Sequence, residues 1–292
     1  MITKNPMQLK AFIKKKAAEK NISAQLVMQN YMLERLLERI SLSKYKYNFI
    51  LKGGFLISAI VGLDTRATMD LDTTIKGFTL THESIRKIFG EICAVEIADD
   101  VKHELVDISD IREGDDYPGI RVALKANYPP ISVPLTVDLT TGDVITPREI
   151  EYTFSLLFDD RTISILAYNL ETVLAEKIET VLSRSIANTH PRDYYDIHIL
   201  YALRGAECNS KTLLQALERT ADKRGSRKYL KSTRILLRRS VQANSSGASG
   251  KNISVFLIMQ RIFPLMMSAI LSSSSWTISR RKKVCKSQEN YK

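Results

Sequence analysis

The sequence predicts an α+β protein in which a mixed sheet with flanking helices is followed by a helical C-terminal part. Short apolar runs that alternate with polar residues occupy the middle of the chain, from about 49 to 166, and are typical of strands. Segments with apolar residues every three or four positions precede and follow them, as amphipathic helices require. The 292 residues, 44% hydrophobic and 26% charged, suit a globular protein with a substantial core.

Two helices are expected ahead of the sheet. Asn5 can cap the first, with Pro6 at its first position, and this helix extends to about Lys20. Ser23 begins the second helix, which has an apolar stripe. The stripe comprises Leu26, Met32, Leu33, Leu36, Leu37 and Ile40. We interpret both helices as a packing module without a chemical role.

The stretch from residue 49 to 75 holds the first motif. It predicts an apolar strand at 49–51, an apolar helix at about 55–61 and a second strand at 69–75. Gly53 and Gly54 fall where the first strand turns into the helix, and there backbone N–H groups and the positive helix end can approach a phosphate. A Gly-Gly pair in this place can also be only a tight turn.

The second strand of this stretch carries Asp70 and Asp72. Successive strand residues alternate faces, so both carboxylates point one way while Met69 and Leu71 point into the core. Two adjacent carboxylates repel each other unless a cation lies between them, and Mg²⁺ suits the place because it prefers oxygen ligands and accompanies nucleotide phosphates. A lone Asp-x-Asp can equally be a solvated strand face.

The rest of the predicted sheet supplies one more candidate carboxylate. A helix at 81–93, strands at 102–109 and 120–127, a strand from 133 and two short strands at 151–166 complete this part. Asp138 lies near the end of the strand from 133, on the face opposite its apolar residues, and can complete a set of three with Asp70 and Asp72. It can also simply prepare the turn at Gly142.

Charged residues on two predicted helices form the second signal. Lys177 lies inside the apolar stripe of a helix at 170–185, so it must either extend to solvent or meet anions. The next helix begins at Pro191 and turns Asp193 and Asp196 inward at positions i and i+3. Acidic residues in a first turn can also serve the helix dipole. Lysine and aspartates on these faces can pair with one another or close over a nucleotide.

The basic balance of the chain belongs to its tail. Residues 231–292 hold 12 Lys and Arg and one acidic residue, Glu289, so the tail accounts for the net charge of +11, and residues 1–230 are neutral overall. The charge is therefore weak support for a nucleic-acid surface on the folded body. Local basic groups are interpreted as solvated faces. One such group comprises Lys223, Arg224, Arg227 and Lys228.

The cysteines and the N-terminus indicate a cytoplasmic protein. Cys93, Cys208 and Cys285 are odd in number and lack zinc-binding spacing, so reduced thiols are expected. The N-terminus lacks the layout of a signal peptide. After a final helix from 210 to about 222, an apolar run at 253–271 contains Gln260, Arg261 and Pro264, which argues against a membrane span. We interpret residues 241–292 as an aberrant or disordered basic tail, and one hypothesis is that a frame shift in the gene produced it.

Together these motifs resemble the AbiEii/AbiGii family of nucleotidyltransferase toxins of bacterial abortive-infection and toxin–antitoxin systems. The resemblance covers about residues 5 to 235 and is carried by three stretches. They are Leu51-Lys-Gly-Gly-Phe-Leu with Arg66-Ala-Thr-Met-Asp-Leu-Asp, Asp138 through Asp143-Val-Ile-Thr-Pro, and Asn169-Leu-Glu-Thr-Val-Leu-Ala-Glu-Lys-Ile-Glu-Thr with Arg192-Asp-Tyr-Tyr-Asp-Ile. The tail departs from the family, which normally continues with ordinary helices.

The resemblance implies a polymerase-beta-like nucleotidyltransferase fold and assigns roles to particular residues. The implied catalytic residues are Asp70, Asp72, Lys177 and Asp193. The implied nucleotide-binding residues are Lys52, Gly53, Gly54, Arg66, Thr68 and Asp196, of which Lys52, Arg66 and Thr68 match motif positions without an individual role. Asp70, Asp72 and the candidate third carboxylate Asp138 would hold Mg²⁺.

The function that follows is transfer of a nucleotide from an NTP to an RNA acceptor, the 3′ end of tRNA in at least some members, in phage defence. A cognate antitoxin encoded nearby would restrain it. The expected domains are a helical segment at 1–44, a nucleotidyltransferase domain at 45–168, a helical domain at 169–240 and the tail. The alternatives are an inactive nucleotide-binding or interaction module and a metal-dependent phosphodiesterase.

Overall fold

The computed structural model describes residues 5–111, 119–184 and 191–230. The predicted tail at 241–292, with its apolar run at 253–271, therefore lies outside the described residues. None of the helices within the described ranges combines the length and the hydropathy needed to cross a membrane. Cys93 and Cys208 are free thiols, and Cys285, the third cysteine of that prediction, lies outside the described residues.

The elements follow the predicted order closely. The helices are α1 (Pro6–Lys20), α2 (Ala24–Leu42), α3 (Gly53–Val61), α4 (His82–Cys93), α5 (Leu170–Arg184), α6 (Pro191–Arg204) and α7 (Ser210–Lys223), with a 3₁₀ turn at Gly205–Glu207. The strands are β1 (Phe49–Lys52), β2 (Asp70–Ile75), β3 (Lys102–Ile111), β4 (Gly119–Tyr128), β5 (Ile131–Thr141), β6 (Ile150–Ser155) and β7 (Thr162–Ala167). The predicted caps at Asn5 and Ser23 are present, each side chain accepting a hydrogen bond from a backbone N–H of its first turn.

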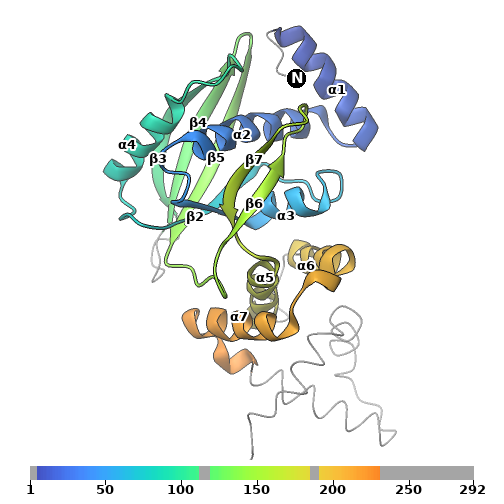
Figure 1. Cartoon of the computed structure of the whole chain (residues 1–292), viewed down its shortest axis with the longest axis vertical. Coiled ribbons are helices and arrows are strands. Elements are labelled where there is room, and N and C mark those ends of the chain that lie inside the picture. Colours follow the sequence, from blue (N-terminus) through green and yellow to red (C-terminus); the bar gives the residue numbers. More distant parts are fainter. Residues whose placement is uncertain (1–4, 112–118, 185–190, 231–292) are drawn as a thin grey trace, which may run out of the picture.

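The described strands form one seven-stranded sheet in the order β3-β4-β5-β2-β1-β7-β6. β2 runs parallel to β5 and antiparallel to β1, while β1 runs parallel to β7, so the sheet is mixed. Figure 1 shows α2 crossing the sheet and α5, α6 and α7 gathered at one end of it, away from α1. The predicted α+β class, a sheet with flanking helices followed by a helical part, is confirmed.

Two local predictions need correction. The helix after β1 starts at Gly53 rather than at about residue 55, so the glycine pair forms the first two residues of α3. Met69 was expected in the core beside Leu71, and Leu71 is buried, but Met69 is 40% exposed. The reason is that β2 begins only at Asp70. Met69 belongs to the irregular segment before the strand, so the alternation of side chains along the strand does not determine where it points.

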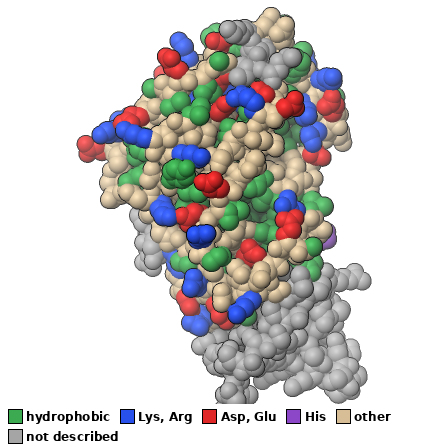
Figure 2. Space-filling view, in the orientation of Figure 1, with side chains coloured by type: hydrophobic (Ala, Val, Ile, Leu, Met, Phe, Trp, Pro, Cys, Tyr) green, Lys and Arg blue, Asp and Glu red, His purple; other side chains and the backbone are tan. Residues whose placement is uncertain are grey.

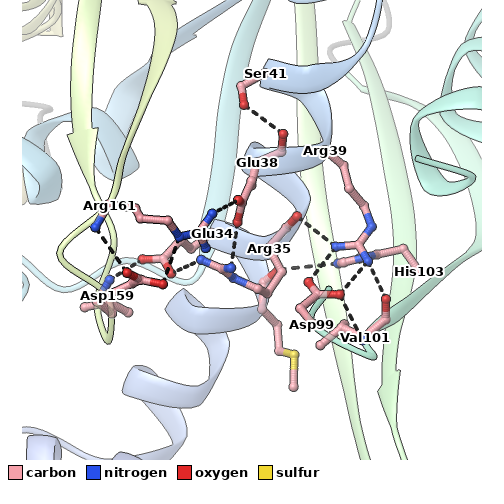
Figure 3. A network of polar contacts seen from close by, with 12 residues as sticks. Glu34, Arg35, Glu38, Arg39, Ser41, Asp99, Val101, His103, Asp159 and Arg161 are labelled. Atoms are coloured by element: carbon pink, nitrogen blue, oxygen red, sulfur yellow. Dashed lines mark hydrogen bonds and ion pairs between the residues drawn. The ribbon is translucent and has the colours of Figure 1, made fainter. Parts of the chain in front are cut away.

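Helix α2 buries charge as well as its apolar stripe. Arg35 pairs with Glu34 at 2.5 Å and with Glu38 at 2.6 Å, and all three side chains are almost inaccessible to solvent. Arg39 makes two hydrogen bonds of 2.8 Å to Asp99, which lies beyond the end of α4 (Figure 3). We call the set the α2 ion network; it comprises Glu34, Arg35, Glu38, Arg39, Asp99 and Arg161.

The charges on the visible surface are mixed. On the face shown in Figure 2, Lys and Arg side chains lie among Asp and Glu side chains. This agrees with the neutral balance of residues 1–230 in the sequence.

Candidate active site

Asp70, Asp72 and Asp138 lie on one face of two neighbouring strands. In the register of β2 against β5, Asp72 stands opposite Asp138 and Asp70 stands opposite Thr136. Residues paired across a sheet point to the same side, so the three carboxylates share a face. We call this surface the carboxylate face. Asp70 is exposed, whereas Asp72 and Asp138 are half-buried.

The glycine pair packs directly against Asp72. Gly53 has a φ of +63°, and a Cβ atom there would lie 2.2 Å from Oδ2 of Asp72, so only glycine fits. The N–H of Gly54 donates to the same Oδ2 at 3.3 Å. A Cβ atom on Gly54 would lie 3.0 Å from Oγ1 of Thr68 and 3.3 Å from Nη2 of Arg66. The positive end of α3 thus adjoins the carboxylate face.

Asp72 stands in an electrostatically unfavourable place. Burial raises the pKa of Asp72, and the neighbouring carboxylates of Asp138 and Asp70 raise it further, while Lys52 and the Gly54 amide oppose the shift. Asp138 is neutralised by Arg121 of β4, which makes two hydrogen bonds of 2.8 Å to its two oxygens.

The residues of this face fit a divalent cation. Within the ranges that the structure describes, no three His, Cys, Asp or Glu side chains are arranged to hold a metal ion. Mg²⁺, however, commonly takes only one or two protein carboxylates and completes its shell with water and substrate phosphates. Asp70 and Asp72 offer such a pair, and a cation would relieve the repulsion at Asp72. The third ligand, Asp138, stays a prediction because Arg121 occupies its carboxylate.

Asp143 is the centre of a second group of polar side chains. Its Oδ2 accepts hydrogen bonds from Lys52 and Thr74. It also accepts from the Tyr168 hydroxyl at 2.8 Å and from the Thr140 hydroxyl at 3.0 Å. Burial alone would raise its pKa, but Lys52 and these donors hold the pKa of Asp143 well below its usual range. We call these five residues the Asp143 cluster. It adjoins the carboxylate face, because Lys52 is paired with Asp72 across β1 and β2.

The predicted lysine and aspartates of the C-terminal helices meet one another. The Nζ atom of Lys177 lies 2.9 Å from Asp193 and 2.8 Å from Asp196, which is fully buried. Burial works against the lysine's charge, but the two carboxylates outweigh it and raise the pKa of Lys177. Asp196 also accepts a hydrogen bond of 2.6 Å from Nε of Arg66. Because Arg66 also lies beside Gly54, it links α6 to the start of α3.

Sequence reasoning predicts a role for only one member of the Asp143 cluster, Lys52. Asp143 itself lies in a stretch that carries the resemblance, but the sequence assigns it no role. Thr74 and Thr140 continue the alternation of Asp72 and Asp138 along their strands, and that period of two was the available signal.

The interpretation of the basic group at 223–228 as a solvated face is partly wrong. Lys223 contacts the turn after β5, and Arg224 of the segment following α7 pairs with Glu179 at 2.6 Å and Glu176 at 2.9 Å. These partners lie on other elements, so the local sequence around Lys223 and Arg224 could not predict the contacts.

In this mixed sheet a Gly-Gly pair begins a helix beside a strand that carries the Asp-x-Asp motif. This is the arrangement of a nucleotidyltransferase. The sequence matches the family model "Nucleotidyl transferase AbiEii toxin, Type IV TA system" over residues 35–256. This is more than half of the chain, so the protein belongs to the AbiEii family. It is a nucleotidyltransferase enzyme of the toxin class of toxin–antitoxin systems. The family implies an NTP substrate and an antitoxin partner.

Three solved structures resemble this chain at low identity. JHP933 from Helicobacter pylori is 17% identical, with a TM-score of 0.45 over 68% of this chain and 75% of that one. Another H. pylori protein, provisionally assigned as a nucleotidyltransferase, is 14% identical, with a TM-score of 0.46 over 86% and 95%. An antigenic nucleotidyltransferase-like protein from Paracoccidioides brasiliensis is 18% identical, with a TM-score of 0.38 over 68% and 93%. No curated protein matches the sequence.

Proposed function

We propose that the protein is a Mg²⁺-dependent toxin that transfers NMP from an NTP to an RNA acceptor, the 3′ end of tRNA. It acts in the bacterial cytoplasm in phage defence and is restrained by a protein antitoxin encoded nearby. The observation that carries the proposal is the placement of Asp72. This half-buried carboxylate lies against the start of α3 and beside two other carboxylates, where an anionic nucleotide and its cation complement the local charge.

The reaction joins the acceptor to the α-phosphate. An acceptor hydroxyl oxygen bonds to the α-phosphorus, the bond from that phosphorus to the β-phosphate oxygen breaks, pyrophosphate leaves, and the hydroxyl proton passes to solvent or a nearby base. Asp70 and Asp72 would hold Mg²⁺, with Asp138 as the candidate third ligand, and the ion would stabilise charge on the phosphates. Gly53 and Gly54 would receive the triphosphate at the N-terminus of α3.

The C-terminal helices would close the other side of the nucleotide. Lys177 would neutralise phosphate charge, and Asp193 would orient Lys177 or the acceptor, as their contact of 2.9 Å permits. Arg66 and Asp196 would hold α6 against the start of α3 through their ion pair of 2.6 Å. Thr68, which adjoins Gly54, and Lys52, which is paired with Asp72, would complete the nucleotide-binding set.

Label transfer tests this function. Purified protein is incubated with Mg²⁺, total bacterial tRNA and each α-³²P-labelled NTP in turn, beside an Asp70→Ala variant, and the RNA is resolved on a denaturing gel. Wild-type protein is expected to label full-length tRNA with at least one NTP, and Asp70→Ala is expected to lose the label. Shortened unlabelled RNA would support phosphodiester cleavage instead, and unchanged labelling in Asp70→Ala would contradict the proposal.

A further inference from the structure

Lys223, in the last turn of α7, reaches the turn that follows β5. Its ammonium group donates a hydrogen bond to the carbonyl oxygen of Gly142 and lies 3.6 Å from Oδ1 of Asp143. The side chain is only 13% exposed. Gly142 has a φ of +73°, a backbone conformation that glycine adopts readily, and it turns the chain so that Asp143 faces both β1 and α7.

Two lysines from different parts of the chain therefore converge on one carboxylate. Lys52 of β1 contacts Oδ2 of Asp143, while Lys223 approaches Oδ1. One carboxylate neutralises one ammonium group, so these three groups carry a net charge of +1. Burial lowers the pKa of Lys223, and the charge of Lys52 acts in the same direction, against the opposing effects of Asp143 and of Glu176. The Glu176 carboxylate is itself paired with Arg224 at 2.9 Å. An additional anion is the complementary occupant.

The position of this lysine pair indicates which anion it would bind. Lys52 stands opposite Asp72 in the register of β1 and β2, and its charge acts on Asp72. The pair therefore borders the carboxylate face, where the proposed reaction places the metal and the α-phosphate. A triphosphate extends beyond that point with several negative charges, and lysine ammonium groups are common phosphate ligands.

We propose that Lys52 and Lys223 form a phosphate-binding pair, oriented by Asp143, for the β- and γ-phosphates of the NTP. The inference rests on the proposed function, because that function places the triphosphate here. Lys52 belongs to the sheet and Lys223 to α7, which packs against the helix that bears Lys177. The phosphate site is consequently complete only when α7 is packed on the body of the protein.

Titration of the full chain with inorganic tripolyphosphate in the presence of Mg²⁺, followed by calorimetry, tests the pair. Lys223→Met keeps the aliphatic stem and removes the charge, and it should weaken binding about 10-fold, the value of one lost charge-assisted contact. Lys223→Arg should restore most of the affinity. Lys211→Met, an exposed position in the first turn of the same helix, changes the net charge equally and should bind as wild type does. Circular dichroism confirms that each variant is folded.

The outcomes separate this inference from the proposed function. Equal affinity of Lys223→Met and wild type would overturn the lysine pair, even where wild-type protein transfers label to RNA. Equal weakening by Lys211→Met would also overturn it, because net charge rather than position would then explain the loss. Tripolyphosphate binding that depends on Lys223 in a protein that transfers no nucleotide would uphold the lysine pair and count against the proposed transfer.

Discussion

The α2 ion network buries its carboxylates and the carboxylate face half-buries Asp72, but the two regions compensate the negative charge in opposite ways. In the network, Glu34, Glu38 and Asp99 each meet an arginine at 2.5 to 2.8 Å. On the carboxylate face, Asp72 meets other carboxylates, and its hydrogen bond to the Gly54 amide is a long 3.3 Å.

The difference separates a structural use of charge from a functional one. Buried ions that are paired within the protein join elements together, as Arg39 joins α2 to the segment after α4 through Asp99. Like charges placed side by side destabilise the empty fold, so their arrangement makes sense where a cation and its ligand arrive from outside. The contrast predicts that changes in the network affect stability, whereas changes on the face affect activity.

The largest effect is expected from breaking the network at its centre. Arg35→Met would leave Glu34 and Glu38 without their shared guanidinium in a buried place, and this should reduce the free energy of unfolding by about 3 to 5 kcal/mol. Urea denaturation followed by circular dichroism measures it. Arg204→Met removes an exposed pair with Glu207 and serves as the control, with no measurable shift of the midpoint expected. Equal midpoints for the two variants would refute the structural role of the network.

A carboxylate-face substitution should show the reverse pattern. Asp72→Asn keeps the side-chain shape but removes the charge that would hold the metal, so nucleotide transfer should fall by about 100- to 1,000-fold. Stability should stay the same or rise, because repulsion from Asp138 and Asp70 is relieved. Initial rates of label transfer and a urea melt test both parts. A loss of stability that matches the loss of activity would place Asp72 with the structural charges.

The pH dependence of stability should come partly from His103, beside the network. Burial lowers the pKa of His103 to about 4, below the ordinary value of 6.5. Between these values the unfolded chain binds more protons, so the contribution of this group is complete above pH 6.5 and is lost as the pH falls toward 4. From pH 7 to pH 5 the loss should be about 2 kcal/mol. His103→Leu should reduce that loss in paired urea melts, and an identical loss would exclude the histidine as its source.

The smallest effect sharpens the role of Asp138. If this carboxylate ligates Mg²⁺, Arg121 competes with the ion for it, because the guanidinium covers both oxygens at 2.8 Å. Arg121→Ala should then lower the Mg²⁺ concentration that gives half-maximal transfer by a few-fold, in line with the modest strength of a half-exposed ion pair. A magnesium titration of the transfer rate measures it. An unchanged half-maximal concentration would remove Asp138 from the ligand set.

Periodicity in the sequence was sufficient for the elements and for the faces of the candidate site. The period of two placed Asp70, Asp72 and Asp138 on one face, and the period of 3.6 turned Lys177, Asp193 and Asp196 inward. The misses involve contacts between distant parts of the chain. Nothing local in the sequence of α2 indicates that its charged residues are buried, because Asp99 and Arg161 complete the network from elsewhere.

Lys223 illustrates the same limit within the site. In the sequence it belongs to a basic group near the end of α7, and such groups are usually solvated. Asp143, which it approaches, lies 80 positions earlier in the sequence, and the contact depends on how α7 packs. Met69 shows a smaller limit, since the first residue of a strand could not be fixed from alternation alone.

The central claim is that the carboxylate face performs nucleotidyl transfer, and a comparison of α- and γ-³²P-labelled NTP tests it most directly. Wild-type protein with Mg²⁺ and tRNA should transfer the α-label to RNA and release the γ-label in pyrophosphate, and Asp72→Asn should lose both signals. Label from the γ-position on RNA, or full α-label transfer by folded Asp72→Asn, would contradict the account.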